Sequence, residues 1–242
     1  MHRTLMVSDI HGCIDTFNQL LHDVDYNSTY DQLMLLGDYV DRGPSSKEVV
    51  DKVMKLVHEH HAVALKGNHD QRFVDFIQEG SSAIQSRFME HGGLPTLESY
   101  CQLKDEISDT RLQQARKSIQ SDYSHHIHFL SSLPLFHEDE NHIYVHAGLN
   151  PDYSDWKQQP EHDFMYIKHK FIQHTFTDLY KKVVFGHTKT IDIHGKADVW
   201  FAADKIGIDG GCAFGMQLNG LIYQDSSYST VQQVNQSMRP LA

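Results

Sequence analysis

GDYVDRG, residues 37–43, is a glycine-bounded polar loop that follows the apolar run QLMLL at residues 32–36. An apolar run of this length predicts a buried strand, and a helical pattern begins shortly after the loop. The loop therefore lies at the carboxyl end of a strand, where open α/β sheets bind their ligands. Asp38 can hold a hard cation, and the Arg42 guanidinium can bind a planar or tetrahedral anion through two hydrogen bonds.

Apolar runs elsewhere in the chain lead into polar loops of the same kind. Strands are expected at residues 3–8, 62–65, 143–145 and 182–185, in addition to 32–36, and a glycine lies close to the end of each. Helical patterns at residues 14–23 and 46–58 separate the first three strands. Repeated strand–loop–helix units predict a parallel sheet with right-handed crossovers.

The rest of the chain is expected to form a single domain, residues 1–242, with these strands. Residues 70–132 are mainly helical in pattern, with a break at 90–97, and by their position they are expected to cap the strand ends. A helix is expected at residues 164–175. Short strands at 205–208, 215–218, 220–223 and 228–234, punctuated by glycines, indicate an antiparallel second sheet. Residues 236–242 are expected to be a loose tail.

The composition excludes several classes of partner. The formal net charge of −11 argues against a nucleic-acid duplex or an anionic membrane. It also disfavours phosphate binding, unless two divalent ions supply the positive charge locally. No apolar stretch approaches the length of a membrane span, and no signal peptide is expected before the first strand. Three scattered cysteines suit a reduced, cytoplasmic protein without disulfides.

The strand ends offer a set of side chains that can ligate two metal ions. A mixture of oxygen and imidazole ligands suits transition metals better than calcium. Manganese is the first expectation, and iron, zinc, cobalt or magnesium are the alternatives. Two such ions can lower the pKa of bound water to about 7 and provide hydroxide for direct attack on phosphorus. We assign Asp9, His11 and Asp38 to the first ion, and Asp38, Asn68, His146 and His187 to the second, with Asp38 as the bridge.

Two further residues are candidates for acid–base work. His69 follows Asn68 directly, and neighbours in an extended loop point apart, so His69 is a poor second ligand but is well placed to protonate the leaving group. Asp41 is expected to orient its imidazole. Arg42 is expected to bind the phosphoryl oxygens and stabilise their charge. Attack by hydroxide requires no cysteine nucleophile, so Cys13 is interpreted as a packing residue.

These motifs resemble the phosphoprotein phosphatases of the metallo-dependent, calcineurin-like phosphatase superfamily. The matching blocks are SDIHG at 8–12, GDYVDRG at 37–43, GNHD at 67–70, HAG at 146–148 and FGHT at 185–188. The closest resemblance is to small bacterial and phage serine/threonine phosphatases and to diadenosine tetraphosphate hydrolases. The resemblance implies an α/β fold, a four-layer α/β/β/α sandwich of two stacked mixed sheets with flanking helices. It also implies the ligands and the acid pair assigned above.

The sequence departs from the family pattern at some positions. Asp70 replaces the usual glutamate after GNH, and Lys66 stands where an arginine often precedes that motif. Lys168 occupies the place of a second phosphate-binding arginine, where it keeps the charge but loses the planar two-point grip. Lys189 replaces a second histidine of the last motif, which favours the phosphoprotein phosphatase branch over nuclease-like branches.

The predicted activity is metal-dependent phosphoester hydrolysis. A serine/threonine-type phosphoprotein phosphatase is the first expectation, and hydrolysis of a dinucleoside polyphosphate such as diadenosine tetraphosphate is the alternative. Because both reactions are attacks on phosphorus, the core motifs do not separate them. A non-catalytic metal-binding module is a third, weaker hypothesis, because every predicted ligand and both members of the acid pair are retained.

Overall fold

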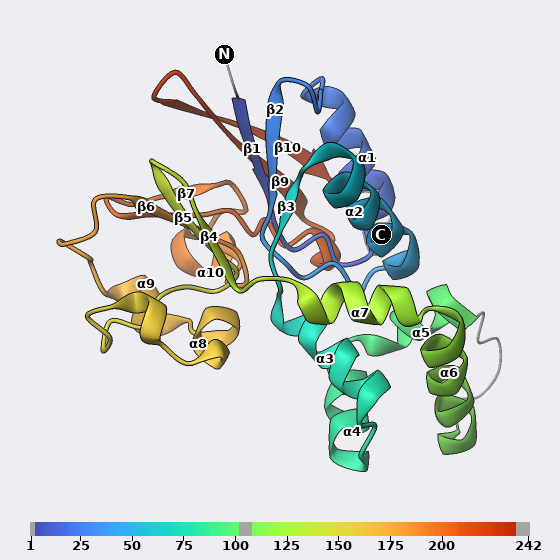
Figure 1. The fold of residues 1–242 in the computed structure, drawn as a ribbon. Coiled ribbons are helices and arrows are strands. Elements are labelled where there is room, and N and C mark those ends of the chain that lie inside the picture. The colour runs from blue at the N-terminus through green and yellow to red at the C-terminus, as the bar shows by residue number, and fades with distance from the viewer. Residues whose placement is uncertain (1–2, 102–107, 236–242) are drawn as a thin grey trace.

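The computed structural model describes residues 3–101 and 108–235, and in this part of the chain two five-stranded sheets stack face to face (Figure 1). The first sheet has the order β10-β9-β1-β2-β3, with β1 (Arg3–Val7), β2 (Asp31–Leu35), β3 (Val63–Ala64), β9 (Gln217–Gln224) and β10 (Ser227–Val234). The second has the order β4-β5-β6-β8-β7, with β4 (Phe136–Glu138), β5 (His142–Val145), β6 (Lys182–Phe185), β7 (Trp200–Phe201) and β8 (Lys205–Gly207).

Each sheet has a parallel centre with antiparallel additions. Strands β1, β2 and β3 are parallel, as the repeated strand–loop–helix pattern predicts, and β9 and β10 add antiparallel beyond β1. In the second sheet β5, β6 and β8 are parallel, whereas β4 and β7 pair antiparallel at the two edges. Both sheets are therefore mixed, and their parallel strands end on the same side of the molecule (Figure 1).

Side chains that alternate along a strand contribute to two different apolar layers of the core. Met6 belongs to an apolar cluster shared with Tyr144 and Ile206 of the second sheet, and it fills the space between the sheets. Its neighbours Leu5 and Val7 belong instead to the cluster on the outer face of the first sheet. Because successive side chains of a strand point to opposite faces, a fully apolar strand such as β1 can contribute to both clusters. The short apolar runs thus encode a buried sheet.

Helices cover the two outer faces. Helices α1 (Ile14–Asp23) and α2 (Ser46–His60) pack on the first sheet through residues such as Phe17 and Val53. On the second sheet, Phe164 and Phe171 cover strands β5 and β6, and α10 (Thr190–His194) contributes Ile193. The structure therefore confirms the expected four-layer α/β/β/α sandwich.

Five helices follow β3 and lie together beyond the strand ends (Figure 1). Their bounds are α3 (Asn68–Gln78), α4 (Ser82–Glu90), α5 (Gly93–Cys101), α6 (Asp109–Asp122) and α7 (Ser124–Ser132). The expected break shrinks to residues 91–92, because α5 begins at Gly93. Residues 102–107, and the tail expected at 236–242, lie outside the described residues. Within residues 3–101 and 108–235, no helix combines the length and apolarity that a bilayer crossing requires.

The expectation of a separate antiparallel sheet near the C-terminus is wrong. Strand β8 joins the second sheet in parallel with β6, whereas β9 and β10 form a hairpin that extends the first sheet. The segments 215–218 and 220–223 also merge into the single strand β9. Gly220 does not interrupt this strand, because its missing side chain accommodates Val231 of β10, whose Cγ1 would lie 2.7 Å from an added Cβ.

The helix expected at residues 164–175 is in fact two short helices. Helix α8 (Glu161–Tyr166) ends at an extended Ile167, and α9 (His169–Gln173) begins after Lys168, whose φ and ψ of −131° and −102° are not helical. The break lets Phe164 and Phe171 both reach the core of the second sheet. Two short 3₁₀ helices, η1 (Trp156–Gln158) and η2 (Cys212–Phe214), lie in connecting segments.

Candidate active site

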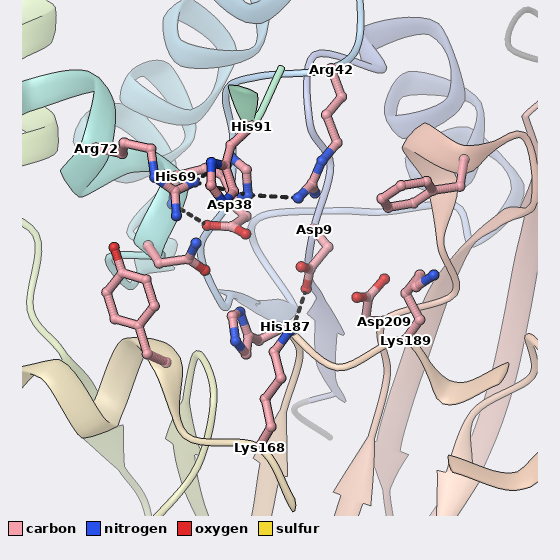
Figure 2. A pocket seen from close by; sticks show the side chains of 13 residues that line it. Asp9, Asp38, Arg42, His69, Arg72, His91, Lys168, His187, Lys189 and Asp209 are labelled. Atoms are coloured by element: carbon pink, nitrogen blue, oxygen red, sulfur yellow. Dashed lines mark hydrogen bonds between the residues drawn. The ribbon is translucent and has the colours of Figure 1, made fainter. Parts of the chain in front are cut away.

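Loops after five parallel strands converge on one pocket of about 270 Å³ (Figure 2). Strands β1, β2, β3, β5 and β6 each deliver at least one predicted ligand just beyond their carboxyl ends, as expected for ligand sites of α/β sheets. The six predicted metal ligands are therefore brought together, although they lie far apart in sequence. They are Asp9, His11, Asp38, Asn68, His146 and His187.

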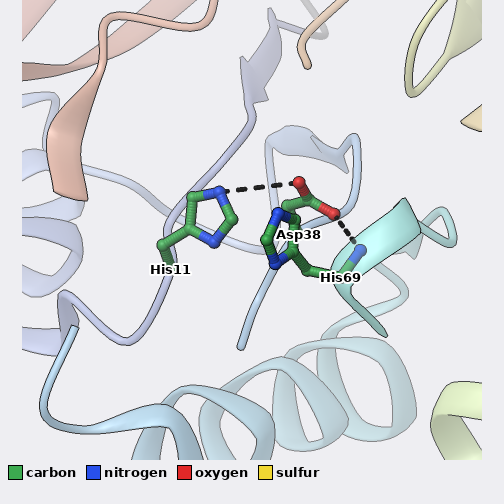
Figure 3. A group of neighbouring side chains, drawn as sticks. All are labelled: His11, Asp38 and His69. Atoms are coloured by element: carbon green, nitrogen blue, oxygen red, sulfur yellow. Dashed lines mark hydrogen bonds and ion pairs between the residues drawn. The ribbon is translucent and has the colours of Figure 1, made fainter. Parts of the chain in front are cut away.

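Asp38 lies between two groups of potential ligands. Its Oδ2 is 3.5 Å from Nε2 of His11 on one side and 3.4 Å from Nε2 of His146 on the other. Asp38 belongs both to a cluster with His11 and His69 and to a cluster with His146 and His187, and in each cluster the ligand atoms lie within 4.8 Å of one another. Figure 3 shows the first of these clusters. This position is the one required of a carboxylate that bridges two ions.

On the first side of Asp38, hydrogen bonds hold His11 and Asp9 so that each keeps one potential ligand atom directed toward the centre of the site. Nδ1 of His11 bonds the carbonyl oxygen of Val40 at 2.7 Å, so its Nε2 faces the carboxylates. Asp9 accepts hydrogen bonds at Oδ2 from Oγ of Ser8 and from the backbone N–H of His187. Its other oxygen lies 3.9 Å from Nε2 of His11. Fixed outer bonds of this kind orient ligands toward a metal.

The second side is built in the same way. Nδ1 of His146 bonds the carbonyl oxygen of Leu36 at 2.8 Å, and its Nε2 lies 3.1 Å from Oδ1 of Asn68. The ring of His187 lies 5.0 Å from that of His146. Among the described residues, Nε2 of His187 is buried and has no hydrogen-bond partner. A buried nitrogen without a partner, aimed at a carboxylate cluster, fits a metal ligand.

The charges around Asp38 favour its ionised form. Burial alone would raise the pKa of this carboxyl, but His146, His69 and His11 outweigh burial and hold the pKa well below its usual range. Conversely, burial opposes protonation of His146, yet Asp38 raises the pKa of that imidazole to about 9. The surrounding imidazoles therefore favour the anionic form of the central carboxyl, the form in which a carboxylate ligates a metal.

The loops that carry the ligands adopt an uncommon backbone conformation. Asp9, His11, Asp38 and His187 all have φ between 47° and 61°, a left-handed region that few non-glycine residues occupy. Such positions cluster at functional sites, where the surrounding structure must hold them in place. Asp70 provides part of this support, because its carboxylate accepts hydrogen bonds from three backbone N–H groups, those of Asp38, Tyr39 and Gly67. Asp70 thus holds this loop by hydrogen bonds, at a position where the family usually has glutamate.

His69 and Asp41 form the expected pair. Nδ1 of His69 lies 2.7 Å from Oδ2 of Asp41, and Oγ1 of Thr96 donates to the other oxygen of that carboxylate. Burial raises the pKa of Asp41 to about 8, whereas burial lowers the pKa of His69 to about 3, with Arg42 contributing to the lowering. The Nη2 of Arg42 donates to Nε2 of His69 at 2.7 Å, so Nδ1 carries the proton that faces Asp41.

Cationic and aromatic side chains complete the pocket. Arg42 also contacts Nε2 of His11, so it lies beside the cluster of His11, Asp38 and His69, and Lys168 lines the pocket as predicted. The guanidinium of Arg42 lies 4.9 Å from the ring centre of Phe214. Sequence analysis assigned no role in the site to several lining residues: Arg72, His91, Tyr166, Lys189, Asp209 and Phe214. Signals did exist for two of them, because Lys189 stands in the last family motif and Arg72 lies one helical turn after His69.

The close packing of Gly67 on Asp38 can be tested directly. An added Cβ at Gly67 would lie 2.1 Å from Oδ1 of Asp38 and 2.3 Å from its backbone nitrogen. We therefore expect Gly67→Ala to displace the carboxylate and to lower turnover by roughly 100-fold, with loss of bound metal. Thermal unfolding should show a stability cost of about 1–3 kcal/mol.

Gly195→Ala is the matched control. Gly195 has φ of 77° but no atom within 4 Å of an added Cβ. This variant should lose about 1–2 kcal/mol from backbone strain and keep full turnover. Wild-type turnover and metal content in Gly67→Ala would show that this contact does not position Asp38.

The fold and the site together define a metal-dependent phosphoesterase, with a histidine- and carboxylate-rich centre at the ends of two stacked sheets. The family model for calcineurin-like phosphoesterases matches residues 2–191. The chain belongs to this family, and it is a metallophosphoesterase. The family and the two His/Asp clusters together imply a dinuclear metal centre.

Known proteins similar to this chain include nucleotide hydrolases. The asymmetrical bis(5'-nucleosyl)-tetraphosphatase PrpE of Anoxybacillus flavithermus is 26% identical over 97% of this chain and 98% of its own length. A crystal structure named for a proposed diadenosine tetraphosphatase activity has a TM-score of 0.66 at 22% identity and covers 97% of this chain and 95% of that one. A serine/threonine phosphatase from Saccharomyces cerevisiae shares the fold, with a TM-score of 0.60 at 14% identity over 96% of this chain and 80% of that one.

Proposed function

We propose that this metallophosphoesterase hydrolyses dinucleoside tetraphosphates, of which diadenosine tetraphosphate is the simplest. The observation that carries the proposal is the likeness to a tetraphosphatase over almost the whole length of both chains. This favours the alternative substrate class over the phosphoprotein class that the motifs alone suggested first. Because the relative is named for asymmetrical cleavage, we propose a nucleoside triphosphate and a nucleoside monophosphate as the products.

The proposed ligands are divided between two metal ions in the way that the sequence suggested. Asp9, His11 and Asp38 hold one divalent ion, and Asp38 holds the other together with Asn68, His146 and His187. The imidazole-rich donor set supports manganese first, with iron, zinc, cobalt or magnesium as alternatives. The two ions, when bound, activate water and polarise the phosphoryl oxygens.

The remaining residues act on the substrate. Arg42 contacts His11 and His69 and lines the pocket, so it can bind the oxygens of the phosphoryl group under attack. His69, oriented by Asp41 at 2.7 Å, protonates the departing oxygen. Substrate oxygens would draw Arg42 away from Nε2 of His69, and this nitrogen would then take up a proton from water, pass it to the departing oxygen and leave the neutral imidazole bonded to Asp41. Lys168 adds a positive charge on the wall formed by the break between α8 and α9.

The pocket rim supports a substrate with several phosphates and a base. Lys189 lines the same pocket as Arg42 and Lys168, so positive charge extends beyond what a single phosphoryl group needs. Phe214 is 52% exposed at this rim, and an exposed aromatic face offers a stacking surface for a nucleobase. A phosphoserine side chain is small and carries one phosphate, so it would use neither the additional positive charge nor the exposed aromatic ring.

The substrate class is tested by comparing catalytic efficiencies. Purified enzyme with excess Mn²⁺ should hydrolyse diadenosine tetraphosphate with a kcat/KM at least about 10-fold above that for a phosphoserine peptide, because one extra charged contact contributes about 1.5–3 kcal/mol. Product analysis by anion exchange should show ATP and AMP in equal amounts. A kcat/KM that is equal for both substrates, or higher for the peptide, would reject the proposal. ADP as the sole product would reject asymmetrical cleavage alone.

A further inference from the structure

Arg72 is a buried cation whose hydrogen-bonding capacity is largely unused. Its side chain lines the catalytic pocket, although only 6% of the residue is exposed. Among the residues that the structure describes, its Nε has no hydrogen-bond partner, and the nearby carboxyl on which its charge acts, that of Asp41, is already bonded to His69 and Thr96. A guanidinium has five N–H donors and no acceptor, so a buried one normally engages carboxylates, carbonyls or a ligand.

The contact between Arg72 and His69 does not satisfy either side chain. Nη1 of Arg72 lies 3.3 Å from Nδ1 and 3.4 Å from Nε2 of the imidazole. Both ring nitrogens already have closer partners, Asp41 at 2.7 Å and Arg42 at 2.7 Å. Nη1 of the guanidinium therefore shares ring nitrogens that are already engaged, and among the described residues Nε has no partner.

The place of Arg72 indicates which part of a substrate it would meet. It lies one helical turn after His69 on α3, and Figure 2 shows it reaching toward His69 and Asp38, whereas Arg42 and Lys168 enter from other sides. In the proposed function His69 protonates the leaving group. The unused donors of Arg72 are thus on the leaving-group side of the phosphoryl group under attack.

We propose that Arg72 binds the phosphates of the leaving group and so selects phosphoanhydrides over simple phosphate esters. In a dinucleoside tetraphosphate the departing fragment is itself a negatively charged phosphate chain, which a planar two-point donor binds well. In a phosphoprotein the departing fragment is an uncharged hydroxyl, which gives a buried guanidinium nothing to bind. The inference rests on the proposed function, because it takes its direction from the role of His69.

The test compares two substrates that differ in the leaving group. Arg72→Gln should lower kcat/KM for diadenosine tetraphosphate about 30-fold, and that for 4-nitrophenyl phosphate, whose leaving group has no phosphate, less than about threefold. Arg72→Lys keeps the charge and should recover part of the loss. Arg87→Gln removes an exposed arginine of the next helix, outside the pocket, and should change neither value. An equal fall for both substrates would overturn the proposal in favour of a role in positioning His69.

A binding measurement separates this inference from the proposed function. By calorimetry on the Mn²⁺-loaded enzyme at fixed excess Mn²⁺, Arg72→Gln should weaken inorganic tripolyphosphate about 30-fold and orthophosphate less than about threefold. This selective loss would support the role of Arg72 even if the wild-type enzyme failed to cleave diadenosine tetraphosphate, which would reject the proposed function alone. Unchanged affinity for tripolyphosphate would overturn the inference. Circular dichroism and thermal unfolding establish that each variant is folded.

Discussion

Asp38→Ala is expected to remove both metal ions and to lower turnover by at least about a thousand-fold, since metal ions contribute several kcal/mol to such reactions. The proposed bridging carboxylate is the residue common to both clusters. Two neighbouring acids have other partners, because Asp70 is committed to three backbone N–H groups and Asp41 faces His69 and Thr96. The loss should therefore affect every phosphoester substrate equally.

The measurement is metal content by mass spectrometry, made on the same preparation as the activity assay. Asp178→Asn, on the exposed surface away from the pocket, is the matched control and should retain two ions and full turnover. A variant of Asp38 that keeps two ions at wild-type stoichiometry would exclude a bridging role. Full wild-type activity after exhaustive chelation would exclude a metal requirement altogether.

His69→Asn is expected to lower turnover of diadenosine tetraphosphate at least about 100-fold while the metal content stays unchanged, because a positioned general acid contributes about 10²–10⁴-fold. The loss should be larger still for an alkyl phosphate ester, because its alkoxide leaving group is a far stronger base than a phosphate chain and depends more on a proton from His69. Asp41→Asn should reproduce part of the effect, since Asp41 acts only by orienting the imidazole at 2.7 Å.

Metal content also decides between two roles for His69. The imidazole lies in one cluster with His11 and Asp38, so loss of an ion in His69→Asn would identify a ligand rather than an acid. His128→Asn, an exposed histidine of α7, is the control and should behave as the wild type. An unchanged rate for the tetraphosphate, with both ions retained, would exclude the acid role.

The parts of the site that the sequence predicted share one physical cause. Asp9, Asp38 and His146 each follow a short apolar run, and the carboxyl ends of parallel strands meet at one edge of a sheet. The pattern of apolar runs was therefore enough to predict that these three side chains lie close together, although the order of the strands was not known. The pairing of His69 with Asp41 followed from their place on neighbouring loops.

The parts that the sequence did not predict depend on contacts between distant segments. Alternation indicates that residues 217–224 form a strand, but it does not say that the partner is β1. The helical spacing of Phe164 and Phe171 continues through Lys168, so nothing local marks the break that turns this lysine into the pocket. Arg72 lies in a polar helix, where a solvated side chain is the ordinary expectation.

The hydrogen bond from the backbone N–H of His187 to Asp9 has a consequence for biosynthesis. These two residues are separated by 178 positions, and a ribosome adding about 5–20 residues per second needs roughly ten to forty seconds to cover that interval. Throughout this time the nascent polypeptide displays Asp9 and His11 without the partner that completes their surroundings. Completion of the site, and with it metal loading, is therefore expected only after residue 187 has been translated.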